Sequence, residues 1–147
     1  MEDGNPTINR LEDQINWYDQ KSQFNQSRYK IYKVAVILVA AIIPFAAGMG
    51  ASSSLIPYIT GGLGVVIILL EGLQSLNQYQ TNWTNYRSIC EGLKHEKYLW
   101  LAKAGSYSSA SEPDKLLAER IESLISQEHA KWVMSQESAA KANEKKE

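Results

Sequence analysis

The 147-residue sequence has little of the chemistry that holds metals or forms covalent crosslinks. It contains one cysteine, Cys90, which excludes an intramolecular disulfide and leaves no sign of an oxidising compartment. Its two histidines are His95 and His129. His95 and Glu96 begin like a zinc-protease motif, but leucine follows where the second histidine belongs. Glu91 could face His95 on a helix, yet zinc needs three or four protein ligands. We therefore expect no metal and no cofactor.

Signatures of catalysis and of nucleic-acid binding are also missing. No nucleophile–base pair and no glycine-rich loop able to hold a phosphate can be recognised. The formal net charge is −1, and no segment is basic enough to follow a phosphate backbone. We expect a protein that is not an enzyme and has no nucleic-acid partner.

The middle of the chain lacks charge altogether, because no Asp, Glu, Lys or Arg lies between Lys33 and Glu71. The mean hydropathy of the whole chain, −0.31, hides this segregation. About 20 apolar residues cross the roughly 30 Å of a bilayer's hydrocarbon. Two spans fit, at 31–51 and 55–73, with a turn at 52–54. A buried hairpin in a soluble bundle is the alternative, but a core helix normally shows one polar face, and neither segment does.

Prolines and basic residues refine this two-span interpretation. Pro57 falls in the first turn of the second span, where its missing N–H is harmless, whereas Pro44 should kink the first span. Basic residues flank the outer ends of both spans, and the turn carries none. The positive-inside rule therefore predicts that both termini are cytoplasmic.

Beyond the second span we expect the helix to continue without interruption through 74–102. Leu, Tyr, Trp, Tyr, Cys and Leu at 76, 79, 83, 86, 90 and 93 form an apolar seam of coiled-coil spacing. A stripe of polar and small residues lies on the opposite face. Its membrane-proximal members are Thr60, Gly64, Ile67, Glu71, Gln74 and Gln78.

Two interpretations of this stripe remain open. It could be a solvated surface, with Glu71 having merely reached the lipid headgroups. Alternatively, copies of the helix could line a pore, with the stripe facing water, Glu71 forming a cation-favouring ring and Ile67 a dewetting gate. The stripe carries no charge after Glu71, unlike an ordinary solvated helix, and this favours the pore slightly.

The rest of the chain is also predicted to be helical. A cytoplasmic helix over 6–33 runs into the first span, a third cytoplasmic helix covers 112–136, and 137–147 is expected to be a flexible tail. The fold class is therefore an all-α membrane protein, a two-transmembrane hairpin with long cytoplasmic helix extensions and a third cytoplasmic helix packing back. We expect one domain over 1–147.

Several side chains outside the spans are candidates for a regulatory site, although a structural role is the default for each. Arg87 and Glu91 are spaced to pair on one helix. Glu128 interrupts an apolar face and could meet Arg87 or Lys94 across the bundle. The aromatic candidates are Trp83, Tyr86 and Trp132.

Three segments carry a family resemblance: AIIPF, the run from LEGLQSLNQYQTNW through LAKAGSY, and ERIESLISQEHAKW. The most specific part is W-x-x-Y-R at Trp83, Tyr86 and Arg87, followed by Glu91 and Lys94. These residues resemble bacterial SLATT-type proteins, which include a large two-transmembrane family catalogued as a domain of unknown function. A proline is common there where this chain has serine at 106, which does not affect the loop predicted at 103–111.

The resemblance implies pore formation or membrane disruption by an effector of bacterial defence, located in the inner (plasma) membrane. It brings no catalytic residues. Two spans cannot enclose a channel, so we expect a cyclic homo-oligomer of about four or more subunits. A cytoplasmic sensor or small ligand could act as trigger. The competing hypothesis is a non-conducting membrane scaffold that recruits cytoplasmic partners.

Overall fold

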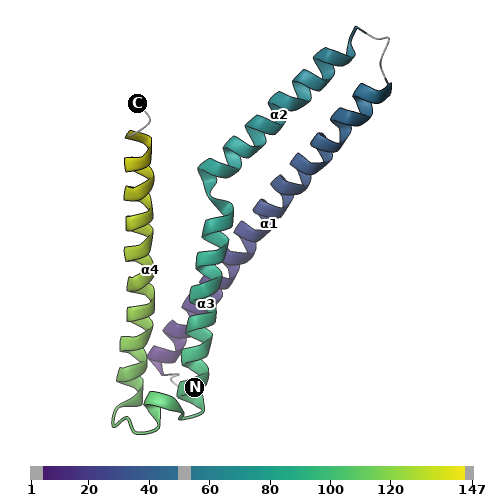
Figure 1. Cartoon of the computed structure of the whole chain (residues 1–147). Helices are drawn as coiled ribbons and strands as arrows, with labels where there is room; N and C mark the ends of the chain where they lie inside the picture. Colours follow the sequence, from purple (N-terminus) through teal and green to yellow (C-terminus); the bar gives the residue numbers. More distant parts are fainter. Residues whose placement is uncertain (1–4, 50–53, 145–147) are drawn as a thin grey trace. The chain divides into compact units, whose positions relative to one another are not determined.

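The computed structural model describes residues 5–49 and 54–144, and these residues form helices without any strand. Figure 1 shows the order along the chain. The elements are α1 (Pro6–Met49), α2 (Ile56–Asn77), α3 (Tyr79–Leu101), the short 3₁₀ helix η1 (Gly105–Tyr107) and α4 (Pro113–Glu144). The all-α fold class is confirmed, and α4 is the expected third helix outside the hairpin.

The single domain expected over 1–147 divides into two compact units. One comprises Ser22–Thr84, and we call it the hairpin unit. The other combines the chain up to Lys21 with the chain from Asn85 onward, and we call it the bundle unit. Both α1 and α3 contribute residues to both units.

Helix α1 begins at Pro6, where the sequence predicts a helix to begin, and it covers the predicted first span up to Met49. Asn5 precedes it, and the side-chain Oδ1 of Asn5 accepts a hydrogen bond of 3.0 Å from the backbone N–H of Thr7. This bond satisfies one of the free N–H groups at the helix start, and Pro6 at the first position has no N–H to satisfy. The helix then runs for 44 residues and continues through Pro44 to Met49.

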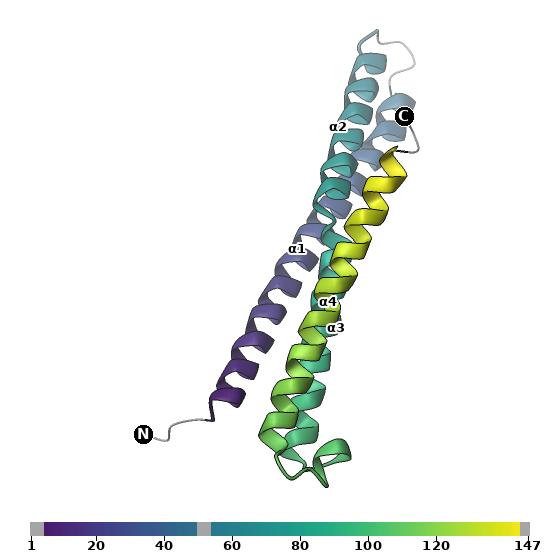
Figure 2. The same cartoon turned by 90° about the vertical axis from the view of Figure 1, so that its left-hand side faces the viewer.

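The hairpin unit pairs the second half of α1 with α2, which lie side by side in Figures 1 and 2. Helix α2 has proline in its first turn, as predicted, and none of its residues is buried. Both helices are long and apolar enough to cross a membrane, and their apolar windows are unburied within the described chain. Large exposed side chains such as Phe45 (69 %) and Ile68 (71 %) would be unfavourable in water. The hairpin therefore suits a lipid environment.

The uninterrupted helix expected from the second span into 74–102 is wrong. Helix α2 ends at Asn77, and Gln78 adopts a left-handed conformation with φ 48° and ψ 36°. Its backbone N–H donates to the carbonyl of Gln74 at 3.1 Å, as in a helix C-cap. The side-chain amide of Asn77 also donates to the Leu73 carbonyl, one turn back in the same helix, at 2.8 Å. Leu76, the first position of the predicted seam, is 83 % exposed and lies outside the core.

The bundle unit contains the hydrophobic core. It brings together α1 before Lys21, the main part of α3, η1 and the start of α4. The buried apolar side chains are Leu11, Tyr18, Ile89, Cys90, Leu93, Tyr107, Leu117 and Ile121. Cys90 and Leu93 therefore occupy the seam positions that the sequence predicts. Helices α3 and α4 pack closely at Gly92, where an added Cβ would lie 3.6 Å from a methyl carbon of Leu124.

Helix α4 is longer than the sequence analysis predicts. It continues to Glu144 instead of giving way to a flexible tail at 137. Three alanines at 139, 140 and 142 have the highest helix propensity of any residue, and this favours continuation of the helix over the polar tail. The side chains of Glu128 and Trp132 lie outside the described part of the structure, as does most of the turn expected at 52–54.

Candidate functional site

An ion pair lies where the apolar part of the hairpin unit ends. Lys33 of α1 donates from Nζ to both carboxylate oxygens of Glu71 on α2, at 2.9 and 3.1 Å. These residues are the last charges before and the first charge after the uncharged stretch. The side chains are 36 % and 42 % exposed, so the pair lies at the surface of the hairpin. Each residue cancels the charge of the other at the boundary of the spans.

The stripe expected to line a pore lies on the half-buried face of α2. Thr60, Gly64, Ile67, Glu71 and Gln74 are all intermediate in exposure, whereas most of their helix neighbours are exposed. Within the hairpin unit α1 is the long helix beside α2, so these positions face α1. Gln78, the sixth predicted member, is exposed at the helix end.

Polar groups on this face are unequally satisfied. The Thr60 hydroxyl donates to the carbonyl of Ile56 in its own helix at 3.0 Å. Among the described side chains, Gln74 Oε1 is buried without a hydrogen-bond partner. A buried acceptor without a partner costs about 1–3 kcal/mol. The contact between α2 and α1 therefore has a weak point one turn beyond the Lys33–Glu71 pair.

Aromatic rings pair across the same end of the hairpin unit. Tyr32 stacks on Tyr79 with ring centroids 5.7 Å apart, and Tyr29 lies 6.1 Å from Trp83. Tyrosine and tryptophan favour the headgroup level of a bilayer, where their amphipathic rings fit. These contacts give Trp83 a packing role at the boundary of the spans.

A second group of charges lies in the bundle unit, around three of the predicted candidates. Arg87 pairs with Glu91 at 2.8 Å, as its spacing predicts, and with Asp19 of α1 at 3.4 Å. Lys94 approaches Glu91 at 3.5 Å and Asp19 at 3.8 Å. The four side chains are between 29 % and 52 % exposed. They form a surface network that ties α3 to α1, in which screened pairs contribute about 0.2–1 kcal/mol each.

Cys90 lies beneath this network and is completely buried. Burial raises the pKa of its thiol, and the positive charge of Lys94 offsets this only in part. Burial also lowers the pKa of Lys94, but Cys90, Glu91 and Asp19 outweigh it and raise the pKa overall. A thiol with a raised pKa has little thiolate and is a poor nucleophile. Cys90 therefore serves packing, in keeping with its predicted place in the apolar seam.

The loop between α3 and α4 is held by two carboxylates. The phenol of Tyr107 is buried and donates to Glu96 at 2.6 Å. Asp114 at the start of α4 accepts from the Trp100 indole at 2.9 Å and from the Asn5 amide at 2.8 Å. These bonds connect η1, both ends of the loop and the start of α1 within the bundle unit. Burial and the Glu96 carboxylate both raise the pKa of Tyr107.

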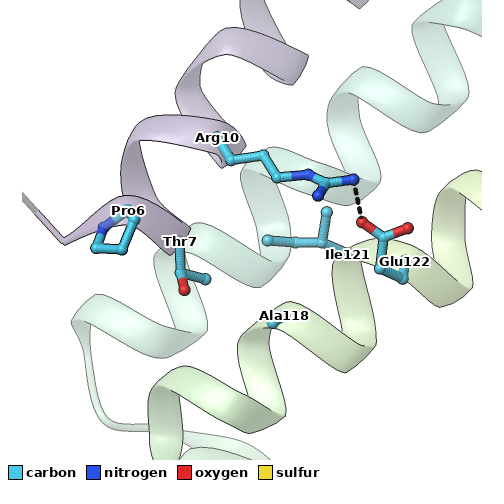
Figure 3. A pocket seen from close by; sticks show the side chains of 6 residues that line it. All are labelled: Pro6, Thr7, Arg10, Ala118, Ile121 and Glu122. Atoms are coloured by element: carbon cyan, nitrogen blue, oxygen red, sulfur yellow. Dashed lines mark ion pairs between the residues drawn. The ribbon is translucent and has the colours of Figure 1, made fainter.

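Figure 3 shows a pocket of about 380 Å³ between the start of α1 and the first half of α4. Arg10 and Glu122 meet across it at 2.5 Å, and both side chains are more than half exposed. The remaining lining residues are Pro6, Thr7, Ala118 and Ile121. Because the guanidinium already has a carboxylate partner, the pocket offers no net charge to a ligand. Among the described residues, no group of three or more His, Cys, Asp or Glu could hold a metal ion.

Sequence reasoning singled out Glu71, Arg87, Glu91 and Lys94 and predicted that Arg87 pairs with Glu91, but it did not find the partners on α1. It missed the pairing of Lys33 with Glu71, which are 38 positions apart. The available signal was that they are the two charges bounding the uncharged stretch. In an antiparallel hairpin the two ends of such a stretch must meet. Asp19, the partner of Arg87, gave no comparable signal.

These features describe a helical protein with a hairpin of two helices long and apolar enough to cross a membrane, and with a small helical bundle. A family model described as a protein of unknown function, DUF4231, matches residues 13–115. The chain belongs to this family, whose match extends from α1 to the start of α4. Comparison with curated proteins and with solved structures found no match.

Proposed function

We propose that the protein is a homo-oligomeric membrane pore, closed when the polar stripe of α2 packs against α1 and open when the stripe faces water. The observation that carries this proposal is the Lys33–Glu71 pair, which closes the hairpin at the end of the stripe. In the open state Glu71 is released to face the lumen, where a ring of carboxylates favours cations.

The energetics of the stripe support a closed state that can open. Lys33 and Glu71 are each more than a third exposed, so screening limits their attraction to about 1 kcal/mol or less. The unpartnered Gln74 Oε1 opposes the closed packing by about 1–3 kcal/mol, and water in an open lumen would satisfy it. The two effects are comparable, so a modest input from an oligomer contact or a trigger is enough to shift the balance.

A lumen requires several subunits, because one hairpin has only two spans. A closed ring of about four or more copies provides it, with both termini in the cytoplasm. The resemblance of W-x-x-Y-R and the following residues to SLATT-type proteins supports an effector role in bacterial defence at the plasma membrane. The bundle unit would then receive the trigger from a cytoplasmic sensor or small ligand.

Ion flux through liposomes carrying the full-length chain tests the proposal. Lys33→Gln and Glu71→Gln should each raise the flux, because each removes the bond that holds the hairpin closed. The exchanged pair Lys33→Glu with Glu71→Lys should return the flux toward the original level. Glu71→Gln should also lower the preference for cations over anions.

Glu112→Gln is the matched control, since Glu112 lies just before α4 and pairs with Lys115 in its first turn, and both side chains are more than 65 % exposed. It should leave the flux unchanged. If Glu112→Gln raises the flux as much as Glu71→Gln does, or if the charge exchange behaves like the single variants, the gating role of the hairpin pair is wrong.

A non-conducting scaffold is the second candidate, because the outer surface of the hairpin would anchor the chain in a membrane whether or not it conducts. The exposed side chains there, including Ile37, Leu38, Ile68 and Leu69, are aliphatic and suit lipid rather than water. Absence of discrete currents from the wild type and all hairpin variants in planar bilayers would support the scaffold. Leakage of large dyes without discrete currents would instead indicate gross membrane disruption.

A further inference from the structure

A shallow apolar groove runs along one side of α1 in the hairpin unit and has a lysine at its polar end. It has a volume of about 400 Å³, is largely open, and is lined by Lys30, Ile31, Val34, Ala35 and Leu38, all from this one helix. The apolar positions follow the three-and-four spacing of a single helix face. Ile31, Val34 and Leu38 are more than half exposed. The residues that the structure describes therefore leave this groove uncovered.

The basic residues near the groove differ in whether they already have partners. The Arg28 guanidinium lies 5.2 Å from the centroid of the Phe24 ring, and Lys33 is bound to Glu71. Lys30, which is exposed, has no ion pair among the residues that the structure describes. It thus places an uncompensated positive charge at the end of an apolar groove, at the level where the uncharged span begins.

We propose that this groove binds one phospholipid with an anionic headgroup, its phosphate on the ammonium of Lys30 and one acyl chain along Ile31, Val34 and Leu38. A long lysine side chain lies along apolar surface and keeps its ammonium at the headgroup level, which suits this geometry. Lipid tails are as apolar as the groove, so the shape of the groove positions the acyl chain and the charge of Lys30 selects an anionic headgroup. The proposal requires the hairpin to be in a membrane and does not require it to conduct.

Lipid retention by the purified full-length chain tests the headgroup contact. The protein is extracted from vesicles of equal phosphatidylglycerol and phosphatidylcholine with identical acyl chains, and native mass spectrometry counts lipids per subunit. We expect the anionic lipid to be retained about fivefold more than the zwitterionic one, the selectivity that one surface lysine provides. Lys30→Gln should abolish the preference and Lys30→Arg should keep it. Lys103→Gln, at an exposed lysine of the bundle unit, should leave it unchanged.

The apolar contact is tested with a matched pair of leucines. Leu38 lines the groove, whereas Leu69 is equally exposed on α2 outside it, at 60 % and 61 %. Leu38→Ala should lower retention of both lipids and leave their ratio unchanged, and Leu69→Ala should change neither. Helicity measured by circular dichroism shows that each variant is folded.

Three results would overturn the lipid site. The first is equal retention of the two lipids by the wild type, and the second is an unchanged preference in folded Lys30→Gln. The third is a wild type that retains no lipid together with a Leu38→Ala variant that no longer forms the oligomer. This result would assign the groove to a second copy of the chain.

Discussion

The ammonium of Lys33 contacts both carboxylate oxygens of Glu71, at 2.9 and 3.1 Å, and joins the two helices of the hairpin unit where their uncharged stretch begins and ends. A charge left alone at this level would have to reach solvent or remain poorly solvated. Pairing allows each helix to carry an ionisable group near hydrocarbon. The pair therefore joins α1 and α2 at the end of the stretch that is apolar enough to cross a membrane.

Thermal unfolding of the full-length chain in detergent should reveal this coupling through a double-mutant cycle. Lys33→Gln and Glu71→Gln each leave one charge without its partner, whereas the double variant leaves none. We expect the double variant to be more stable than the sum of the single effects predicts, by about 0.5–1 kcal/mol. Additive losses would mean that the two charges do not interact in solution.

Replacing Gln78 by glycine should stabilise the chain, because a left-handed conformation costs a non-glycine residue about 1–2 kcal/mol. Part of this gain is lost to the greater freedom of glycine in the unfolded chain, so we expect about 0.5–1 kcal/mol in the free energy of unfolding. Gln80→Gly, two residues later inside α3, should instead destabilise by about 1 kcal/mol. Destabilisation by both changes would show that the helix continues through 78.

Tyr107→Phe should lower the free energy of unfolding by about 1–2 kcal/mol near pH 7, since Phe cannot donate to Glu96. Burial and Glu96 raise the pKa of the phenol above its usual 10, so the folded state holds the proton more tightly than the unfolded state. The contribution of Tyr107 is therefore complete below pH 10 and is lost as pH rises toward the folded pKa. In chemical denaturation from pH 7 to 11, the gap between wild type and variant should narrow above pH 10. Tyr98→Phe, at a 68 % exposed ring, should produce neither effect.

Cys90 should react slowly with maleimide at pH 7.5, because its thiol is buried and its pKa is raised. We expect labelling about 100-fold slower than that of a free thiol, equivalent to an opening free energy of about 3 kcal/mol. Ser88→Cys in a Cys90→Ala background places a thiol at an exposed position of the same helix and should label rapidly. Comparable rates for the two thiols would contradict the buried assignment of Cys90.

Local composition was sufficient for much of the fold. Asn5 followed by Pro6 specifies the start of α1, and the uncharged stretch specifies both apolar helices. The three-and-four spacing of apolar residues correctly placed Cys90 and Leu93 in the core. The prediction failed at Gln78, because apolar spacing shows that the flanking segments are helical. It does not show that one residue between them leaves the helical conformation. The prediction also failed beyond residue 136, where polarity was given more weight than the helix propensity of the alanines.

The polar stripe shows the limit of periodicity most clearly. Spacing placed Thr60, Gly64, Ile67, Glu71 and Gln74 on one face, and the structure keeps them together on a half-buried face. Periodicity shows which residues share a face and does not show which neighbour that face contacts. The face was expected to meet water, either at a solvated surface or in a pore, and in the single chain it is half-buried beside α1.

The sequence by itself determined where the chain is apolar, where its helices begin and which residues share a face, because these properties depend on neighbours within a few turns. Only the tertiary structure decided that Lys33 meets Glu71, that Asp19 meets Arg87 and that Tyr107 meets Glu96. Each of these contacts joins residues from separate helical segments. Their distance depends on how the helices pack, and no local pattern of residues encodes it.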